Sequence, residues 1–335
     1  MIILSAIGIL VSSLVIYYAG EHFATASSFM GDYMGISRSA KGATFDAISS
    51  SMPELLIALF SVILFSKFEI GVGTIVGSAL FNILIIPSLC AFVSPKIFKV
   101  SDDVIHRDGL FYVLTVIILM MVMFYNVRWS MYVGILFIAT YILYFLEIFR
   151  HGTAKNYGRR LLKFIRLGPS YKHVSKVRKN QKKLHHEILI LIISLVFIII
   201  SSYFLVKYSL ILATTLGIPP IIIAFVITAA ATSIPDLVIS VADARKGDIS
   251  SATSNVFGSN IFDILIGLGL PVLIATLMGI NIEITPMSLF ILFGLLVSTV
   301  VTLYILAENM KLTKPRAILL ILMYITLVSY IVIVS

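Results

Sequence analysis

The stretch GATFDAISSSMPEL at residues 42–55 decides the fold, because a second copy of it occurs as AFVITAAATSIPDL at residues 224–237. The second copy follows the first at an offset of 182, and each copy carries an acid directly after a proline. A further pair follows at an offset of 181, GSALFNIL at 77–84 and GSNIFDIL at 258–265. The matched polar and proline positions are Ser51 with Ser233, Pro53 with Pro235, Glu54 with Asp236, Ser78 with Ser259, and Asn82 with Asp263.

The sequence around these motifs is strongly apolar. Of its 335 residues, 59% are hydrophobic and 12% are charged, whereas globular domains average about 45–50% and about 25%. Its mean hydropathy is +1.07. Runs of about 20 apolar residues are long enough for helices that cross the hydrocarbon core. Because the runs are continuous and not alternating, they exclude a β-barrel. The first run lacks a positively charged leader, so we expect it to be retained as a span. The pattern therefore predicts an all-α, multi-pass protein of the cell membrane.

Ten spans can be assigned from the apolar runs. They fall near residues 3–19, 40–65, 70–93, 109–126, 130–149, 187–206, 219–242, 251–277, 285–306 and 316–334. The polar segment 150–186 divides them into two groups of five. We therefore predict a first five-helix repeat at 1–149, a basic loop at 150–186 and a second five-helix repeat at 187–335.

The basic residues predict the orientation. Segment 150–183 holds 12 of the 25 Lys and Arg residues and no acid, so the positive-inside rule places it in the cytoplasm. With ten spans the cytoplasmic loops hold 22 of the 25 basic residues, and Lys67, Arg128 and Lys207 remain outside. Both termini are then extracellular. We also expect the 150–183 segment to contact anionic lipid.

The two motifs lie in the second and seventh spans and so cross the membrane in opposite directions. Inverted repeats of this kind place transporter substrate sites near the membrane midplane, on broken helices. Pro53 and Pro235 lack an amide hydrogen, so the carbonyls of Ser49 and Ala231 lose their helical partners. An unpaired carbonyl in hydrocarbon is costly, and a bound cation would satisfy it.

Four acids lie deep within the apolar spans, namely Asp46, Glu54, Asp236 and Asp263. A charge at the bilayer centre costs about 2.5–3.5 kcal/mol on insertion scales. No Lys or Arg lies deep enough in the predicted spans to pair with them, so bound cations or protons are expected to balance the charge. Asp46 differs from the others because its repeat partner is Thr228. It could line the cytoplasmic access path, carry a proton or add a ligand.

The residues around these acids favour a hard cation. They supply hydroxyl and amide oxygens, which calcium prefers, from Ser50, Ser51, Ser78, Asn82, Thr232, Ser233, Asn255, Ser259 and Asn260. Neither His nor Cys joins the motifs, which argues against zinc, copper or nickel. The i, i+4 spacing places Ser78 with Asn82 on one helix face, and Ser259 with Asp263 on another.

The motifs resemble those of a known family. GATFDAISSSMPEL with GVGTIVGSALFNIL, and ATSIPDLVISVADARKGD with SNVFGSNIFDIL, are similar to the two alpha repeats of the cation/calcium exchanger superfamily. They are most similar to its potassium-dependent sodium/calcium exchanger branch. The resemblance covers roughly residues 36–93 and 217–271. It implies exchange of Na⁺ for Ca²⁺ by alternating access, with the first span and a partner in the second half acting as a sliding gate.

The resemblance also implies a ligand set. Glu54 and Asp236 would be the central ligands for calcium and sodium, and Asp263 would be tied to potassium as well. The sites would be completed by Ser51, Ser78, Asn82, Ser233 and Ser259 and by backbone carbonyls near Ala47 and Ala229. Asp46 stands where the family has an apolar residue, and Ser49 and Ser50 replace a Gly-rich stretch. These departures leave ion stoichiometry and potassium use open.

Two other functions remain as alternatives. A calcium/proton antiporter gains from Asp46 as an extra acid, but relatives of that kind usually carry a G-N-x-x-E motif that this chain lacks. An intramembrane aspartyl protease also needs two membrane acids, but no G-x-G-D motif occurs. A phosphate-binding loop is absent as well, which argues against an ATP-driven pump. The sequence thus predicts a transporter of inorganic cations with no cofactor, no nucleic-acid partner and no evident obligate protein partner.

Overall fold

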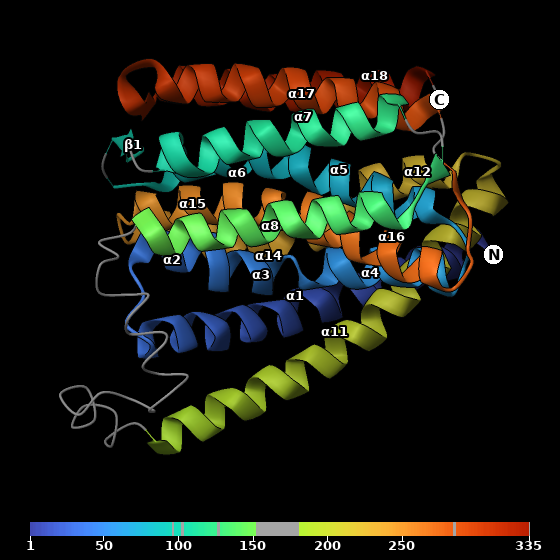
Figure 1. Ribbon diagram of the computed structural model, residues 1–335, viewed down its shortest axis with the longest axis horizontal. Coiled ribbons are helices and arrows are strands. Elements are labelled where there is room, and N and C mark those ends of the chain that lie inside the picture. The colour runs from blue at the N-terminus through green and yellow to red at the C-terminus, as the bar shows by residue number, and fades with distance from the viewer. Residues whose placement is uncertain (96, 102–103, 126–127, 152–180, 284–285, 335) are drawn as a thin grey trace.

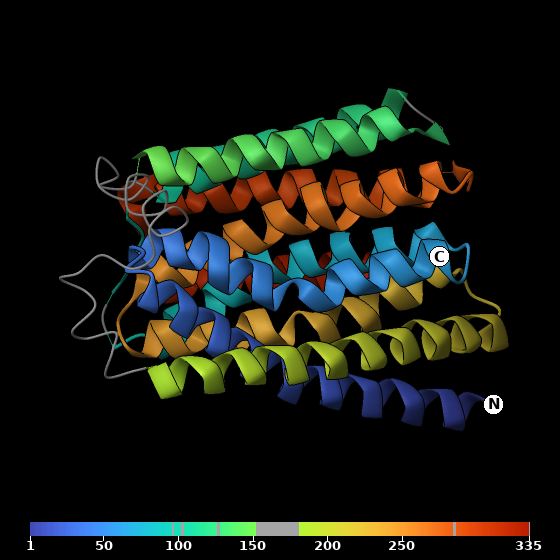
Figure 2. The ribbon, with the colours of Figure 1, turned by 60° about the horizontal axis from the view of Figure 1, so that its bottom comes forward.

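The protein is a bundle of long helices that run side by side along one direction (Figure 1). The computed structural model describes residues 1–335 except 96, 102–103, 126–127, 152–180, 284–285 and 335. Helices α1 (Ile2–Tyr33) and α11 (Gln181–Leu216) lie at one edge of the bundle, and α17 (Pro286–Ala307) and α18 (Lys314–Val334) lie at the opposite edge. The two chain ends lie at the same end of the bundle (Figures 1 and 2).

The first half of the chain is interrupted at the repeated motif. A helix that begins at Arg38 passes through a π-helical turn, breaks at Ser51 and resumes with a bend of 42°. Pro53 stands in the first turn of the new helix, where its missing amide hydrogen costs no helical bond. After α1, the elements of this half are α2 (Arg38–Lys41), η1 (Gly42–Asp46), α3 (Ala47–Ser50), α4 (Met52–Ile63), α5 (Phe68–Leu84), α6 (Ile86–Val93), β1 (Phe98–Lys99), η2 (Val104–Gly109), α7 (Leu110–Tyr125), β2 (Arg128–Trp129) and α8 (Met131–His151).

The second half is interrupted at the equivalent place. It breaks at Ser233, and Pro235 again stands in the first turn of the following helix. The π-helical turns η1 and η3 also occupy equivalent positions, because 42–46 and 224–228 are related by the offset of the repeated motif. Between α11 and α17 the elements are α12 (Pro220–Ile223), η3 (Ala224–Thr228), α13 (Ala229–Thr232), α14 (Ile234–Arg245), α15 (Ile249–Phe262), η4 (Asp263–Leu268), α16 (Gly269–Leu277) and β3 (Ile282–Glu283); η5 (Glu308–Met310) and β4 (Lys311–Leu312) precede α18.

The predicted helical, multi-pass architecture is confirmed, although the described residues also include four two-residue strands. Among the described residues, nine helices are long and apolar enough to cross a membrane, and the bent pair Arg38–Ser50 and Met52–Ile63 makes ten. The predicted ends of two spans were too short. Helix α1 continues to Tyr33 and not to 19, because no proline interrupts it and its distal part packs against η1, α3 and α14. Helix α11 likewise extends beyond 187–206 at both ends.

Two short strand pairs join the halves of the chain. Strand β1 pairs with β4, where Phe98 lies opposite Leu312, and β2 pairs with β3, where Trp129 lies opposite Ile282. Both pairs are antiparallel. Each pair thus takes one strand from each half and ties together loops that are far apart in the sequence.

Glycines allow the helices of one half to approach those of the other half closely. A Cβ at Gly77 of α5 would lie 2.5 Å from the carbonyl oxygen of Phe225 in η3. A Cβ at the repeat-equivalent Gly258 of α15 would lie 2.8 Å from Cα of Ala43 in η1. Small residues permit backbone contact of this kind in membranes. The motif helices of each half therefore pack on the broken helix of the other half.

Candidate cation-binding site

The repeated motifs converge at the centre of the bundle, where the two helix breaks face α5 and α15. Glu54 and Asp236 stand in the first turns of α4 and α14. Asp263 follows the end of α15 and begins the π-helical turn η4. All three carboxylates have no solvent-exposed surface, and Glu54 interacts electrostatically with both of the others. Three acids from distant segments thus share one buried region.

Each of the two central acids accepts hydrogen bonds from predicted site residues. Ser78 Oγ donates to Glu54 Oε1 at 3.2 Å. Ser259 Oγ donates to Asp236 Oδ1 at 2.6 Å, and Asn82 Nδ2 donates to Asp236 Oδ2 at 2.9 Å. The Asn82 contact joins the two halves, since the partners are 154 residues apart.

Hydroxyl groups connect the two halves further. Ser233 Oγ donates to Ser78 Oγ at 2.8 Å, and Ser50 Oγ lies 3.3 Å from Ser259 Oγ. Ser51 and Ser78 lie near Asp263. These contacts bring the predicted serines, Asn82 and the three acids into one cluster.

Several oxygens of this cluster have no hydrogen-bond partner in the part of the chain that the structure describes. They are Oε2 of Glu54, both carboxylate oxygens of Asp263, Oδ1 of Asn82 and Oγ of Ser51. Buried polar atoms are normally paired, so these atoms need explanation. Among the described residues, the three acids contact hydroxyls, amides and each other, and no Lys or Arg. The arrangement has the donor atoms that a hard cation requires.

The acids alone would not enclose an ion. In the described ranges, no three acidic, His or Cys side chains lie close enough to hold a metal ion together. Serine and amide oxygens would therefore have to complete any coordination shell. Calcium and sodium accept such neutral oxygen ligands readily, whereas zinc and copper prefer nitrogen and sulfur.

Thr232 lies near Glu54, and helix bonds engage its hydroxyl and the backbone carbonyls of Ala47 and Ala229. The Ala47 carbonyl accepts from the Ser51 amide at 3.1 Å and from Ser50 Oγ at 3.2 Å. The Ala229 carbonyl accepts from the Ser233 amide at 3.0 Å and from Thr232 Oγ1 at 3.2 Å. Rotation of either hydroxyl would free one acceptor position on the carbonyl. The two halves therefore present the same potential carbonyl ligand.

Sequence reasoning missed part of the polar interior. Ser240, on α14, accepts from Asn255 Nδ2 at 3.0 Å, and the same amide reaches the Asp236 carbonyl at 3.5 Å. Asn260, which the sequence did single out, donates from Nδ2 to the Ala79 carbonyl at 3.0 Å. The i, i+4 spacing of Asp236 and Ser240 on one helix was the signal that could have found Ser240.

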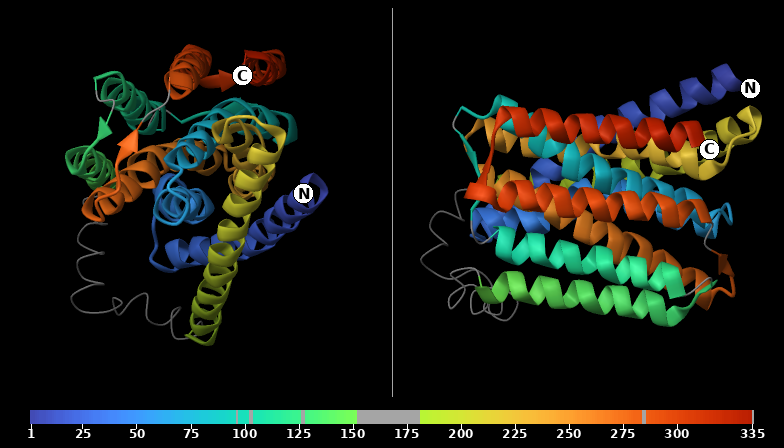
Figure 3. Two further views of the ribbon diagram at one scale, coloured as in Figure 1. Left: turned by 90° about the vertical axis from the view of Figure 1, so that its right-hand side faces the viewer. Right: turned by 90° about the horizontal axis from the view of Figure 1, so that it is seen from above.

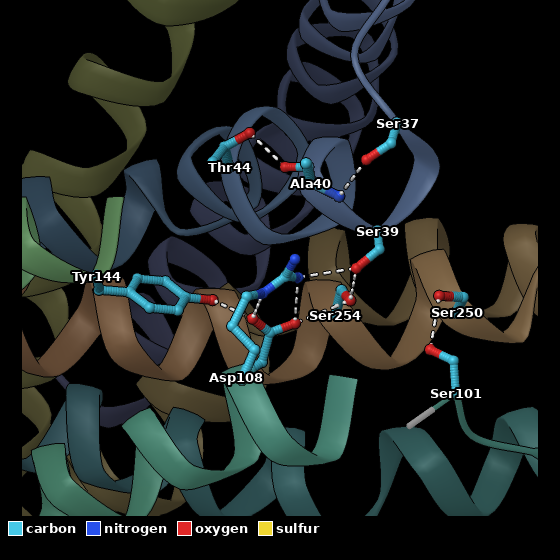
Figure 4. Close-up of polar contacts among 10 residues, drawn as sticks. Ser37, Ser39, Ala40, Thr44, Ser101, Asp108, Tyr144, Ser250 and Ser254 are labelled. Atoms are coloured by element: carbon cyan, nitrogen blue, oxygen red, sulfur yellow. Dashed lines mark hydrogen bonds and ion pairs between the residues drawn. The ribbon is translucent and has the colours of Figure 1, made fainter. Parts of the chain in front are cut away.

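Asp108 was also missed, because it sits at the predicted start of a span, beside Arg107, where an acid usually faces water. It has no exposed surface. Figure 4 shows Tyr144 of α8 and Ser254 of α15 pointing at its carboxylate, at 3.1 and 3.0 Å. Arg107 forms two further bonds to it at 2.6 and 2.8 Å and reaches Ser39 of α2 at 2.8 Å. This cluster joins four helical segments at the end of the bundle that carries α2.

The comparison with known protein families agrees with this geometry. The sodium/calcium exchanger protein family matches residues 4–149 and 186–333. The chain belongs to this family. Its members are membrane ion transporters and not enzymes, and the ions that they exchange are Na⁺ and Ca²⁺. The predicted membership of the exchanger superfamily and the predicted multi-pass membrane location are confirmed.

Individual relatives cover most of the chain. It is 26% identical over 343 residues to the sodium/calcium exchanger MaX1 of Methanosarcina acetivorans, covering 95% of each chain. It is 26% identical over 359 residues to human sodium/potassium/calcium exchanger 5, covering 80% of this chain and 71% of the relative. A solved structure of the sodium-calcium exchanger NCX_Mj, soaked with Na⁺ and Sr²⁺, matches with a TM-score of 0.68 at 24% identity, over 98% of this chain and 99% of that one. That likeness shows that the chain has the same fold as NCX_Mj.

Proposed function

We propose that this exchanger moves Ca²⁺ across the membrane in exchange for Na⁺ by alternating access. The ions would bind at Glu54 and Asp236, with Asp263 as a third acid. The remaining ligands would be Ser50, Ser51, Ser78, Asn82, Thr232, Ser233 and Ser259 and the carbonyls of Ala47 and Ala229. The single observation that carries the proposal is the set of unpaired, fully buried carboxylate, amide and hydroxyl oxygens around these acids.

Competition for the same carboxylates explains the exchange. Two unit charges 4 Å apart interact by about 4 kcal/mol at an effective dielectric constant near 20, so three unneutralised carboxylates repel one another strongly. Either Ca²⁺ or Na⁺ relieves this repulsion, and binding of one ion displaces the other. An empty acidic site resists crossing the hydrocarbon, whereas a loaded site does not. The gate can therefore move when ions are bound.

The two halves of the chain fit an inverted repeat. The helix breaks, the π-helical turns and the Gly77 and Gly258 contacts recur at the offsets of the sequence motifs. The strand pairs fit the same relation, because each joins one strand from each half. We propose repeats at 1–149 and 187–335, with both termini extracellular. The connecting loop 150–186 and its expected contact with anionic lipid fall mostly on residues 152–180, which lie outside the described residues.

Helices α1 and α11 are the proposed moving elements. They pack along each other at the edge of the bundle, and α1 crosses η1, α3, α13 and α14 (Figures 1 and 3). Gly20 of α1 lies against Pro235, where a Cβ would come within 2.8 Å of the proline ring. A helix that touches both broken helices can cover the ions on one side and then on the other as it slides.

The test is calcium uptake into proteoliposomes loaded with sodium. An outward sodium gradient should drive uptake, and an imposed pH gradient without sodium should not. Uptake driven by the pH gradient alone would support the calcium/proton alternative and overturn the proposal. Glu54→Gln should abolish uptake, while Lys314→Gln, which changes an exposed side chain at the start of α18, should leave it intact.

Potassium use is a separate question within the same proposal. The similarity to a sodium/potassium/calcium exchanger and the unpaired carboxylate of Asp263 support it. Repeating the uptake assay with potassium or choline outside decides the matter. If potassium has a role, uptake rises with external potassium, and Asp263→Asn removes the increase.

A further inference from the structure

A second acidic position lies away from the proposed ion cluster, towards the end of the bundle that carries α2. Asp46 ends the π-helical turn η1 and is 1% exposed. Neither of its carboxylate oxygens has a hydrogen-bond partner within the described residues, although Ser28 lies near them. It stands eight residues before Glu54, roughly 12 Å along a helix, and is therefore too far away to share an ion with Glu54. This acid needs its own explanation.

Two columns of polar side chains, one on each broken helix, lead from the proposed cluster to Asp46 and to a second acid, Asp243. On the first broken helix, Glu54, Ser50 and Asp46 follow at intervals of four residues, and Ser50 Oγ bonds the Asp46 carbonyl at 2.8 Å. On α14, the residues Asp236, Ser240 and Asp243 follow at i, i+4 and i+7, so they share one face. Helices α3 and α14 contact each other, and Asp46 interacts electrostatically with Asp243. The columns therefore run side by side.

Lys41 lies at the end of the two columns, near Asp46 and Asp243. Its side chain is only 12% exposed, and its ammonium lies 2.9 Å from Ser28 Oγ and 3.2 Å from Asp32 Oδ1, both on α1. It interacts electrostatically with Asp46 and with Asp243. Within the described chain, however, no ion pair within 4.0 Å joins Lys41 to either acid. The ammonium is thus held by α1 beside the two acids without contacting them directly.

The internal repeat shows that the architecture does not require the charges of Lys41, Asp46 and Asp243. At the offset of 182, Lys41 corresponds to Ile223, Asp46 to Thr228, and Asp243 to Ser61. The second half thus has no charge at the positions that match Lys41 and Asp46, and the first half has none at the position that matches Asp243. Because buried charges in a membrane protein are costly and usually functional, a feature confined to one end indicates a function at that end.

We propose that Asp46 and Asp243 form a staging site for calcium on the access path at the Lys41 end of the bundle. The site rests on the proposed exchange function and lies between the proposed central cluster and the face predicted to be cytoplasmic. In the closed arrangement Lys41, tethered to α1, supplies positive charge beside both acids, and Lys246 pairs with Asp243 at 3.9 Å from the end of the same helix. When α1 slides, the Lys41 ammonium moves away with Ser28 and Asp32, and a calcium ion takes its place before moving on to the cluster.

The test measures the half-saturating calcium concentration of exchange separately at each face, in proteoliposomes of defined orientation. Asp46→Asn and Asp243→Asn should each raise this half-saturating concentration at the Lys41 face by about tenfold, the lower end of the local ion enrichment that charged clefts produce. Lys41→Gln should lower it at the same face. The values at the opposite face should stay constant. A matched control is Lys99→Gln, which removes the same charge from an exposed side chain at the same end.

Ionic strength gives a second readout that a structural role would not change. Raising the concentration of choline chloride should reduce the effect of all three substitutions, because salt screens an accessible charged site. Equal shifts at both faces, or a shift of the same sign for Lys41→Gln as for Asp46→Asn, would overturn the staging site.

Direct binding separates this proposal from the exchange function. Purified protein carrying Asp236→Asn, in detergent, should retain weak calcium binding that a further Asp46→Asn change removes. If wild-type vesicles show no sodium-driven uptake yet this weak site is present, the proposed function fails and the site stands. If exchange proceeds and the site is absent, the staging proposal fails alone.

Discussion

Replacing Asp108 by Asn should destabilise the protein strongly, although the two side chains have nearly the same shape. The carboxylate accepts two bonds from Arg107 at 2.6 and 2.8 Å, one from Ser254 at 3.0 Å and one from Tyr144 at 3.1 Å. The Arg107 side chain is 8% exposed, so the variant would remove the carboxylate that this nearly buried guanidinium contacts twice. Breaking a buried pair in this way costs about 3–5 kcal/mol.

Equilibrium unfolding in mixed micelles would measure this loss. Trp129, the single Trp of the sequence, reports on it, because the indole is 4% exposed and packs between Phe68 and Phe137. A change of about 3–5 kcal/mol moves the unfolding equilibrium by roughly 2 to 4 orders of magnitude. Asp108→Asn should therefore unfold at a clearly lower denaturant concentration than the wild type.

A double variant separates the charge from the packing. With Asp108→Asn and Arg107→Gln together, both charges are gone, and part of the lost stability should return, because much of the cost of breaking a buried pair is the uncompensated charge. A loss below about 1 kcal/mol for Asp108→Asn, or no recovery in the double variant, would refute the view that the buried ion pair in η2 ties this turn to α2, α8 and α15.

Three further predictions follow from the proposed site and from the helix packing. Asp236→Asn should weaken calcium binding more than 100-fold, because one unit charge near the ion is worth about 4 kcal/mol or more. Isothermal titration of calcium into the protein in detergent would measure this change. A change below tenfold would remove Asp236 from the site. Ser259→Ala removes the 2.6 Å hydrogen bond to the Asp236 carboxylate and should cost about 1.5–3 kcal/mol in ion affinity. The same assay measures this loss, and Ser259→Thr, which keeps the hydroxyl, should show a smaller loss. Gly77→Ala would place a Cβ 2.5 Å from the Phe225 carbonyl oxygen and 2.6 Å from Ala229 Cβ. It should therefore lower the free energy of unfolding by about 1–3 kcal/mol. An unchanged free energy of unfolding would show that these helices can separate without cost.

Much of the candidate site could be predicted from the sequence. The prolines located both helix breaks to within two residues, and the repeat singled out Glu54 and Asp236 as equivalents. Other features could not be read in this way. The π-helical turns have no local sequence signal. The burial of Asp108 has none either, because an acid beside an arginine at a span end has the same sequence whether it faces water or protein.

The sequence by itself determined the class of this protein, its two related halves and its intramembrane acids. Those features follow from local physics, since hydrocarbon demands long apolar helices and makes every charge within them costly. Only the tertiary structure decided which groups meet. Asn82 reaches Asp236 and Ser233 reaches Ser78 across 154 and 155 residues, and Lys41 contacts Ser28 and Asp32 of α1 within electrostatic reach of Asp46 and Asp243. Such partners depend on how closely glycine-bearing helices of opposite halves approach, and the sequence records the glycines without recording which helix fills the space beside them.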